Sequence, residues 1–368
     1  MTVPLIDLSQ QHQQLMPELL QAFEQMVKSG RFILGPAVEH FEQSLAQYCR
    51  VRQTVGMSSG TDAILAALMA IDLKPGDEVI TSPFTFFATA GCVARLGGVP
   101  VFVDIDPVSF NIDPNLIEAA ITPRTKAIMP VHLYGQMADM KAINTLARKH
   151  GLKVIEDACQ AIGATDQGIE AGASGDIGCF SFYPTKNLSA MGDAGACSSN
   201  SPALLERLRA IRQHGMTQRY HHPMIGGNFR LDAIQASILD IKLRHLNNWI
   251  EARRANADRY NRELADLPLT LPREQAEKLH VYNQYTVRVP AHRREEFRHH
   301  LSAKGIGHEI YYPTPLHLQP CFEYLGKPEG SFPLSEQAAR EVVSLPIFPE
   351  MTQTQQSQVI QVVREFFA

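Results

Sequence analysis

Two stretches of this sequence decide its fold: Val154-Ile155-Glu156-Asp157-Ala158-Cys159-Gln160 and Ser181-Phe182-Tyr183-Pro184-Thr185-Lys186-Asn187-Leu188. The first is an apolar strand that ends in a carboxylate. The second places a lysine in a turn of small residues, ahead of the glycines in residues 191–195. The carboxyl ends of parallel strands form the ligand-binding edge of an open sheet. A lysine between apolar strands is expected to be shielded from solvent, and its amine can form a Schiff base if its pKa is lowered. Taken alone, each residue has an ordinary alternative, a strand-end cap for Asp157 and a solvated surface position for Lys186.

Short apolar runs alternate with amphipathic stretches from about residue 50 to 215, which is the pattern of β-α-β-α units. Strands are predicted at Gln53–Met57, Glu78–Thr81, Val99–Asp104, Lys126–His132, Lys153–Asp157, Cys179–Phe182 and Ala194–Ser198. Helices are predicted between them at Thr61–Ile71, Thr85–Leu96, Pro114–Ala120, Asp139–His150 and Pro202–His214. The sequence therefore predicts an α/β fold with a mostly parallel, seven-stranded sheet flanked by helices.

The pattern changes after Leu231, where one long helical stretch from Asp232 to about Leu264 is expected to connect two domains. A strand at Gln284–Val289 follows, with helices at Arg293–Lys304, Ser335–Val343 and Thr352–Phe367. Near the start of the chain, a helix is predicted at about Pro17–Gly30. We predict a large α/β domain over residues 31–245 and a smaller α+β domain over residues 246–368. Residues 1–30 are expected to pack with the smaller domain.

The composition argues against several classes of protein. The 368 residues include 34 Lys+Arg and 38 Asp+Glu, a net charge of -4, whereas nucleic-acid binding needs a basic face. The six cysteines include no C-x-x-C pair, and the histidine pairs at 221–222 and 299–300 are poorly spaced for one metal ion. The N-terminal residues lack the basic and apolar pattern of a secretory signal, and no apolar segment reaches membrane-spanning length, so neither a signal nor a membrane span is expected. A cytoplasmic protein without a metal, a membrane or a nucleic-acid partner is expected.

The segment Gly56-Met57-Ser58-Ser59-Gly60-Thr61-Asp62 joins a strand to a helix start. Small residues at a helix start leave N–H groups and hydroxyls free for an anion, so a phosphate site is one interpretation and a plain capped helix is the other. The segment also matches the G-x-S-x-G nucleophile elbow, in which Ser58 would attack an ester. Only about 50 residues precede it, too few for the several strands that usually come first, so a hydrolase is disfavoured.

Pyridoxal phosphate needs the groups that these segments supply. It requires a lysine for its aldehyde, a carboxylate for its pyridinium nitrogen, a helix start for its phosphate and an aromatic ring to stack on. At ~4 Å and an effective dielectric constant of ~20, an ion pair gains roughly 4 kcal/mol, which is about three pK units. A carboxylate at the end of the first stretch would therefore keep the ring nitrogen protonated.

Four motifs carry a resemblance to a known family: Ser-Ser-Gly-Thr-Asp-Ala at 58–63, Glu-Asp-Ala-Cys-Gln-Ala at 156–161, Ser-Phe-Tyr-Pro-Thr-Lys-Asn-Leu at 181–188 and Gly-Asn-Phe-Arg-Leu-Asp-Ala-Ile-Gln-Ala at 227–236. Together they resemble the nucleotide-sugar aminotransferases of the DegT/DnrJ/EryC1/StrS family, which are fold-type I pyridoxal-phosphate enzymes. The similarity extends from the N-terminal Pro-Leu-Ile-Asp-Leu to Ser-Leu-Pro-Ile-Phe-Pro at 344–349.

The resemblance implies roles for individual residues. Lys186 would hold the cofactor and shuttle protons, Asp157 would pair with the pyridinium, and Gln160 would hydrogen-bond the ring oxygen. Phe86 would stack on the ring, although a core position within the run Phe84–Phe87 is the alternative. Phosphate contacts would come from Gly60, Thr61, Ser181 and, from the second subunit of a homodimer, Asn228.

The resemblance also implies a reaction. The family transfers an amino group, usually from glutamate, to a keto-sugar carried on UDP or dTDP, with pyridoxamine phosphate as the form of the cofactor that carries the amino group. The turn after the lysine resembles enzymes that act on 3-keto rather than 4-keto sugars. Such chemistry serves amino-sugar biosynthesis for surface polysaccharides or glycosylated metabolites. Substrate contacts are expected from residues whose alternative roles are rim or packing positions: Arg230, His308, Tyr312 and His317.

Two other functions stay open. Sugar dehydratases of the same family have histidine in place of the lysine, and here the residue is Lys186. A cofactor-binding regulator without turnover would need a DNA-reading or sensor module, and no such basic module stands out in the sequence.

Overall fold

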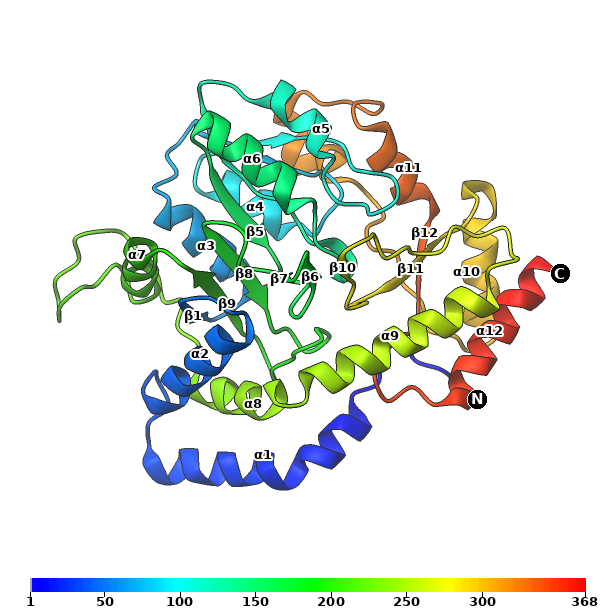
Figure 1. Cartoon of the computed structure of the whole chain (residues 1–368), viewed down its shortest axis with the longest axis horizontal. Helices are drawn as coiled ribbons and strands as arrows, with labels where there is room; N and C mark the ends of the chain where they lie inside the picture. Colours follow the sequence, from blue (N-terminus) through cyan, green and yellow to red (C-terminus); the bar gives the residue numbers. More distant parts are fainter. Residues whose placement is uncertain (1) are drawn as a thin grey trace.

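The computed structural model describes residues 2–368 and has a seven-stranded sheet at its centre (Figure 1). The strands lie in the order β1-β9-β8-β5-β4-β2-β3. Strand β9 runs antiparallel to both of its neighbours, and the other pairings are parallel. The predicted α/β class and mostly parallel sheet are confirmed. The strand bounds are Gln53–Met57 (β1), Glu78–Thr81 (β2), Val99–Phe102 (β3), Thr125–Ile128 (β4), Lys153–Asp157 (β5), Ile177–Ser181 (β8) and Gly195–Ser199 (β9).

Helices cover both faces of this sheet, because successive side chains of a strand point to opposite faces. In β5, Val154 packs in one hydrophobic core with residues of α2, α6 and α8, and Ile155 packs in another with residues of α3, α4 and α7. Helix α2 lies outside the elements predicted from the sequence. The bounds are Pro36–Tyr48 (α2), Gly60–Ala70 (α3), Ala88–Arg95 (α4), Met140–His150 (α6), Pro202–Arg212 (α7) and Ala233–Leu243 (α8).

Several predicted elements of this region are shorter in the structure. The strand predicted at Val99–Asp104 ends at Phe102, and the helix predicted at Pro202–His214 ends at Arg212. The strand predicted to reach His132 ends at Ile128, because Pro130 has no N–H with which to extend the ladder. The helix predicted from Thr85 begins at Ala88. The helix predicted at Pro114–Ala120 is a single α-helical turn, α5 (Pro114–Ile117), continued by a 3-10 turn over Glu118–Ala120.

The long helix predicted over Asp232–Leu264 is two helices, α8 and α9 (Leu246–Glu263), separated at Arg244 and His245. At this break the His245 N–H donates to the Lys242 carbonyl at 3.0 Å, a tighter turn than the α-helix. Helix α8 packs on α1 and α2, whereas α9 leads away to the C-terminal part of the chain (Figure 1). The break therefore lets one helical stretch serve two packing environments.

The C-terminal part is built on an antiparallel strand pair, β11 (Tyr285–Arg288) and β12 (Val342–Leu345). Val342 and Val343 were predicted to end a helix, but that helix, α11 (Pro333–Glu341), stops before them. Their β-branched side chains suit a strand, and both are fully buried. Helices α10 (Arg294–Ala303) and α12 (Gln353–Phe367) contact each other beside this pair. A separate small sheet joins β6 (Thr165–Asp166), β7 (Ile169–Glu170) and β10 (Lys278–Leu279).

The N-terminal segment touches both halves of the chain. Val3 forms a bridge with Ile306, next to α10. Helix α1 (Ser9–Ser29) begins well before the predicted start near Pro17, and it packs Leu15 and Leu19 against Ile238 and Ile241 of α8 and Trp249 of α9. The domain boundaries at residues 30 and 245 stay a prediction.

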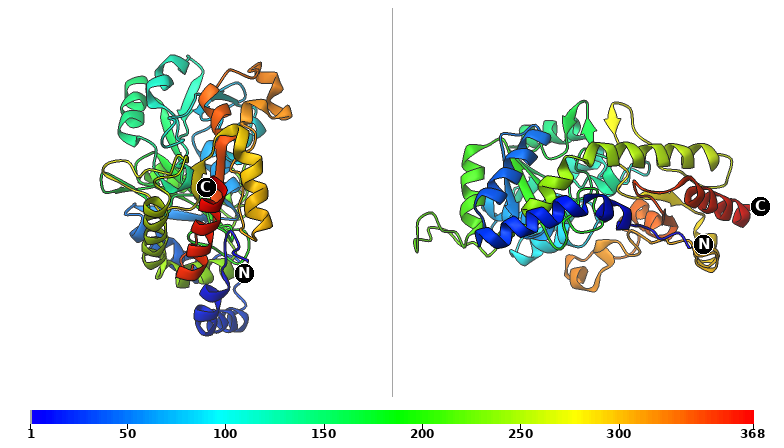
Figure 2. Two further views of the ribbon diagram at one scale, coloured as in Figure 1. Left: turned by 90° about the vertical axis from the view of Figure 1, so that its right-hand side faces the viewer. Right: turned by 90° about the horizontal axis from the view of Figure 1, so that it is seen from below.

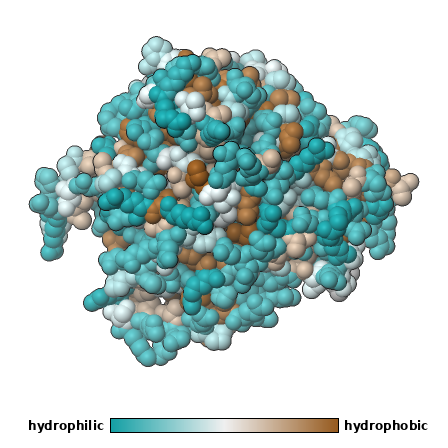
Figure 3. Space-filling model, viewed as in Figure 1, coloured by the Kyte–Doolittle hydropathy of each residue, from teal (hydrophilic) through white to brown (hydrophobic). Residues whose placement is uncertain are grey.

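The segment between α7 and α8 extends away from the rest of the molecule in two views (Figures 1 and 2). Tyr220 and Ile225 within it are 81% and 85% exposed. The face drawn in Figure 3 is mostly hydrophilic with small apolar patches. Within residues 2–368, no helix has the length and apolar character needed to cross a membrane.

Candidate active site

A cavity of about 660 Å³ lies where β5 and β8 end and α3 begins. It is lined by Asp157 from β5, Ser181 from β8, Lys186 from the following turn and Gly60 from α3. The position agrees with the expectation that ligands bind at the carboxyl edge of a parallel sheet. The other lining residues are Ser59, Thr61, Ile64, Thr85, Phe86, Ala88, Val131, Cys159, Gln160, Tyr183, Thr185, Asp193, Gln284, Tyr311 and Tyr312.

The residues at the start of α3 line this cavity and pack closely against β8 and β9. Ser59 caps the helix, and its hydroxyl accepts a hydrogen bond from the Asp62 N–H at 3.0 Å. A Cβ added to Gly60 would lie 2.6 Å from the Ser181 Cβ, so this position has no room for a side chain. Gly195 of β9 is equally confined, because a Cβ there would lie 2.3 Å from the Ser59 carbonyl oxygen. The helix start therefore faces the cavity with N–H groups and small hydroxyl side chains, a suitable cradle for a phosphate.

The alternative interpretation of this segment as a nucleophile elbow fits poorly. The Ser58 hydroxyl donates to the Asp62 carboxylate at 2.6 Å. A catalytic serine needs a base that accepts its proton, and in the established triads that base is a histidine. Ser58 is also absent from the residues that line the cavity.

Asp157 is 5% exposed and is held by two donors. The Thr89 hydroxyl donates to Oδ2 at 2.7 Å, and the Cys159 N–H donates to Oδ1 at 3.3 Å. Thr89 is itself 3.1 Å from Thr85 through their hydroxyls. Thr89 was not among the predicted site residues. The only sign of this contact in the sequence was the spacing of Thr85 and Thr89, which are four residues apart and would lie on one face of a helix.

The neighbour of Asp157 in β5 serves a different purpose. Glu156 is fully buried on the opposite face, where its carboxylate accepts hydrogen bonds from the Gly172 and Gly175 N–H groups at 2.9 and 2.6 Å. Its Oε2 also lies 2.9 Å from Nε2 of His132. Since the Ala138 N–H donates to Nδ1 of that histidine, Nε2 carries the proton that Glu156 accepts. These bonds anchor β5 behind the cavity.

Lys186 sits in the turn after β8, where its N–H donates to the Tyr183 carbonyl at 2.8 Å. Burial lowers the pKa of its amine, and the nearby Cys159 and Asp157 oppose that shift. The neutral amine, which is the nucleophilic form, is thus easier to reach than in a surface lysine. The same burial raises the pKa of the Cys159 thiol well above its usual range, so this thiol stays protonated.

The side-chain amide of Gln160 is fixed from both ends. Its Oε1 accepts from the Tyr134 N–H at 2.7 Å, and its Nε2 donates to the Tyr312 hydroxyl at 3.0 Å. Burial raises the pKa of the Tyr312 phenol, with Asp157 adding to the effect, so Tyr312 stays a neutral donor. Phe86 lies at the cavity 56% exposed, with its ring 6.2 Å from that of Tyr312, whereas Phe84 is fully buried. Within the apolar run Phe84–Phe87, the residue that packs in the core is therefore Phe84 and not Phe86.

Four predicted site residues do not line the cavity of this chain: Asn228, Arg230, His308 and His317. The exposed Asn228 follows the extended segment, and its neighbour Phe229 accepts from the Ser58 N–H at 3.0 Å. Arg230 forms a bridge with Met57, and its Nε has no partner. His308 lies 3.1 Å from the Ile306 carbonyl through Nδ1. His317 is buried, with Nε2 3.1 Å from the Glu336 carboxylate.

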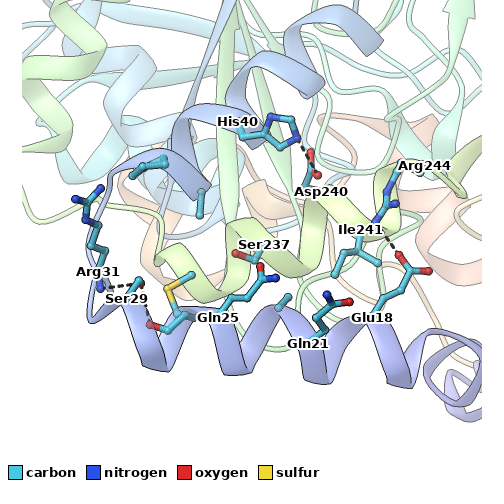
Figure 4. A pocket seen from close by; sticks show the side chains of 14 residues that line it. Glu18, Gln21, Gln25, Ser29, Arg31, His40, Ser237, Asp240, Ile241 and Arg244 are labelled. Carbon is cyan, nitrogen blue, oxygen red and sulfur yellow. Dashed lines mark hydrogen bonds and ion pairs between the residues drawn. The ribbon is translucent and has the colours of Figure 1, made fainter.

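Another cavity, of about 690 Å³, lies between α1, α2 and α8 (Figure 4). Its charged groups are largely paired. His40 points to Asp240 at 3.3 Å, and Arg244 points to Glu18 at 2.9 Å. It shares no residue with the cavity around Lys186. Across residues 2–368, the structure brings together no group of three or more His, Cys, Asp or Glu side chains that could hold a metal ion.

Comparison with known proteins gives consistent matches over nearly the whole chain. The family model described as the DegT/DnrJ/EryC1/StrS aminotransferase family matches residues 13–364. A Geobacillus stearothermophilus protein named pleiotropic regulatory protein is 51% identical, with 100% of this chain and 99% of that protein covered. A Streptomyces venezuelae dTDP-3-amino-3,4,6-trideoxy-alpha-D-glucose transaminase is 44% identical, with 99% and 96% covered. An Acidithiobacillus ferrooxidans UDP-N-acetyl-3-dehydro-alpha-D-glucosamine 3-aminotransferase is also 44% identical, with 98% and 97% covered.

Solved structures agree. The crystal structure of S. venezuelae DesV is 44% identical and superposes with a TM-score of 0.96, covering 99% of this chain and 98% of that one. NtdA from Bacillus subtilis, solved with bound pyridoxamine phosphate, is 36% identical with a TM-score of 0.90, covering 96% of this chain and 82% of that one. The donor set around Lys186 and Asp157 fits the same cofactor. This chain belongs to the DegT/DnrJ/EryC1/StrS aminotransferase family and is a pyridoxal-phosphate-dependent sugar aminotransferase.

Proposed function

We propose that this enzyme moves an amino group, from L-glutamate, to the keto carbon of a nucleotide-linked sugar. The observation that carries the proposal is the single cavity lined by the shielded Lys186 amine, the buried Asp157 carboxylate and the start of α3. The sugar would be carried on UDP or dTDP, and a 3-keto sugar is favoured over a 4-keto sugar. Two relatives support this choice, because both are named for 3-amino products and differ in the nucleotide. The product would serve amino-sugar biosynthesis for a surface polysaccharide or a glycosylated metabolite.

When bound, pyridoxal phosphate supplies an aldehyde for amine exchange and a protonated ring that accepts the electron pair of a breaking C–H bond. Asp157 would hold the proton on the ring nitrogen, with Thr89 fixing its Oδ2. The N–H groups and hydroxyls of Gly60, Thr61 and Ser181 would bind the phosphate. The Gln160 side chain would hydrogen-bond the ring oxygen of the cofactor, and the exposed face of Phe86 would stack on its ring. These roles are proposed from the placement of the residues.

Lys186 would act as the base of the reaction. The lowered pKa of its amine means that Nζ can accept a proton from the carbon that loses it and return that proton to the carbon that gains it. Tyr183, Tyr311 and Tyr312 line the cavity and would limit the access of water once the sugar is bound. Exclusion of water strengthens the pairing of Asp157 with a cationic partner.

The diphosphate of the substrate needs cations that the cavity does not supply. Of the described residues that line it, Lys186 is the one cation, and Asp157 and Asp193 are acidic. We therefore place Arg230 and His308 at the edge of the substrate site and Tyr312 inside it. Arg230 is partly exposed, which supports this placement. His317 is not carried into these contacts because it is buried against Glu336.

A second copy of the chain would complete the site. Asn228 is exposed and lies outside the cavity of its own chain, at the base of the extended segment between α7 and α8, where it forms a bridge with Gln213. Helix α1 presents a row of exposed apolar side chains at helical spacing, Met16, Leu20, Phe23 and Val27. Such a row favours burial in an interface. We propose a homodimer in which this row is covered and Asn228 reaches the phosphate of the partner's cofactor.

A regulatory role without turnover is the second candidate, because the relative at 51% identity is named a pleiotropic regulatory protein. The two candidates differ in a direct test, since a regulator would bind the cofactor and sugar without producing an amino-sugar. A sugar dehydratase is disfavoured by Lys186. We place the reaction in the cytoplasm, where the described cysteines, all unpaired, would remain reduced.

The experiment has two parts. Borohydride reduction of the purified enzyme followed by peptide mapping should label Lys186, and a label on another lysine would overturn the proposed mechanism. Mass spectrometry of products from UDP- and dTDP-linked 3-keto and 4-keto sugars with glutamate should show a mass change from ketone to amine with one sugar. A loss of water instead would indicate the dehydratase, and binding without any product would indicate the regulator.

A further inference from the structure

Lys242 of α8 is fully buried, which is rare for a lysine unless its amine has partners. Its Nζ donates to the Ser189 hydroxyl at 3.0 Å and lies 3.3 Å from Nε2 of His12 on α1. Burial and the positive charge of Lys242 both lower the pKa of His12, so its ring is neutral and Nε2 can accept. Two other charged groups act on this region. Glu350 attracts both Lys242 and the buried Arg253.

Ser189 belongs to the segment that carries Lys186, residues 186–191, which we call the lysine turn. Helix α8 contacts the lysine turn at two points. Gln235 accepts from the Met191 N–H at 2.8 Å and donates to the Met191 carbonyl at 3.0 Å, while Lys242 holds Ser189. Gln235 and Lys242 are seven residues apart and thus lie on one face of α8. One helix face therefore holds the C-terminal half of the lysine turn.

The Lys186 amine has no hydrogen bond of its own in the part of the chain that the structure describes. Its location in the cavity is therefore set by the backbone of the lysine turn and by the packing of its stem. Inside the turn, the Lys186 N–H donates to the Tyr183 carbonyl at 2.8 Å and the Ala190 N–H donates to the Phe182 carbonyl at 2.7 Å. The side chain of Asn187 donates to the Val281 carbonyl at 3.0 Å. Lys242 donates a further hydrogen bond to this turn at the Ser189 hydroxyl, and Ser189 is buried with 2% of its surface exposed.

We propose that Lys242 is a positioning residue for Lys186: through Ser189 it holds the lysine turn in the place from which the Lys186 amine reaches the reacting carbon. The inference rests on the proposed role of Lys186 as the base. The ammonium suits this task because both neighbours, Ser189 and His12, present acceptors to it. A methionine would fill similar space but would donate nothing, so the turn would lose its bond to α8 at Ser189.

The test compares three variants of the holoenzyme. Lys242→Met and Ser189→Ala remove the same bond from its two ends. Lys278→Met is the matched control, because Lys278 is another largely buried lysine that donates to the Met137 and Ala138 carbonyls, away from the lysine turn. Hydrogen–deuterium exchange of the peptide that covers residues 186–191 is the main measurement. Steady-state kinetics with the accepted sugar is the second.

We expect Lys242→Met and Ser189→Ala to speed exchange of the turn by about tenfold or more and to lower kcat with little change in KM for the sugar. The double variant should be no worse than the stronger single variant, because both changes remove one bond. Lys278→Met should leave exchange of the turn as in the wild type. If Lys242→Met fails to fold, Ser189→Ala alone decides the outcome.

Unchanged exchange in the turn of Ser189→Ala, or an equal increase in Lys278→Met, would overturn the inference. Failure of the proposed function looks different. In that case borohydride labels no Lys186 in the wild type, while the exchange measurement still reports whether Lys242 holds the turn.

Discussion

Replacing Lys242 with methionine should change how the stability of the protein depends on pH. Burial lowers the pKa of Lys242 from its ordinary value of 10.5 to about 8, although the attraction of Glu350 limits the shift. The folded chain therefore holds fewer protons than the unfolded chain between about pH 8 and 10.5. Stability rises with pH wherever the unfolded state binds more protons, so the contribution of Lys242 to the stability of the wild type should rise across this window.

The size of the effect follows from the same shift. The difference of 10.5 - 8 = 2.5 units, at ~1.36 kcal/mol per unit, corresponds to a cost of about 3 kcal/mol. This cost is fully present below pH 8, where Lys242 is charged in both states, and it is lost as the pH approaches 10.5. Methionine does not titrate, so the Lys242→Met variant lacks this contribution. The free energy of unfolding of the variant relative to the wild type should therefore fall by about 3 kcal/mol between pH 7 and pH 10.5.

Urea unfolding at a fixed protein and cofactor concentration measures this difference. The single tryptophan, Trp249, is a convenient fluorescence reporter because it packs from the start of α9 against α1 and α8. Glu350 and Arg253 are present in both proteins, so their own titration largely cancels in the comparison. The pKa of His12, which burial and Lys242 lower from its ordinary value of 6.5, lies below the pH range of the experiment. Lys28→Met, which removes an exposed lysine of α1, is the control for the loss of a lysine side chain as such. Parallel curves for Lys242→Met and the wild type over the whole range would refute the reasoning.

Four further outcomes test the site. Asp157→Asn should lower turnover far more than cofactor affinity, because it keeps the shape of the side chain but loses the charge; near wild-type turnover with bound cofactor would contradict this role. Thr89→Val should lower kcat by about tenfold to a hundredfold, since a hydrogen bond to a charged group contributes roughly 1.5–3 kcal/mol, and an unchanged kcat would show that Cys159 alone orients the carboxylate. Gly60→Ala should weaken cofactor binding in a spectroscopic titration, because its Cβ would lie 2.6 Å from the Ser181 Cβ; wild-type affinity would mean that the cradle can widen. Mixed Lys186→Ala and Asn228→Asp subunits should regain activity, because a heterodimer with a shared site has one site free of both changes, whereas a mixture that stays inactive would place the whole site within one chain.

The elements that could be predicted best are those whose sequence pattern has one physical solution. Strand β5 was predicted at Lys153–Asp157 and is found there, because its β-branched residues follow directly on a helix that ends at Gly151. Val342 and Val343 were assigned to a helix because their strand partner, β11, lies more than fifty residues away in the sequence. The break between α8 and α9 was missed for a related reason. It depends on the two packing surfaces that the helices meet.

In the candidate site, too, residues within a local motif could be predicted, whereas residues that act through distant contacts could not. Lys186 and Asp157 lie in local motifs, and both line the cavity. Thr89 acts on Asp157 from a helix 68 positions earlier, a contact that no local pattern encodes. The roles of histidines are the hardest to predict. In a Pro-rich segment, the sequence around a histidine does not reveal whether its side chain faces a ligand or packs in the core. His317 packs inside, against Phe332 and Glu336.

The adjacent carboxylates of β5 make the length of that strand inflexible. Asp157 faces the cavity, and Glu156 faces the anchoring bonds from Gly172, Gly175 and His132. Deleting or inserting one residue within the strand would exchange the two faces, because side chains alternate with a period of two. The longer glutamate would then enter the cavity while an aspartate met the anchoring donors, and both sets of contacts would fail together. Changes in chain length should therefore be tolerated in the turn at Gly151, before the strand, and not between Val154 and Asp157.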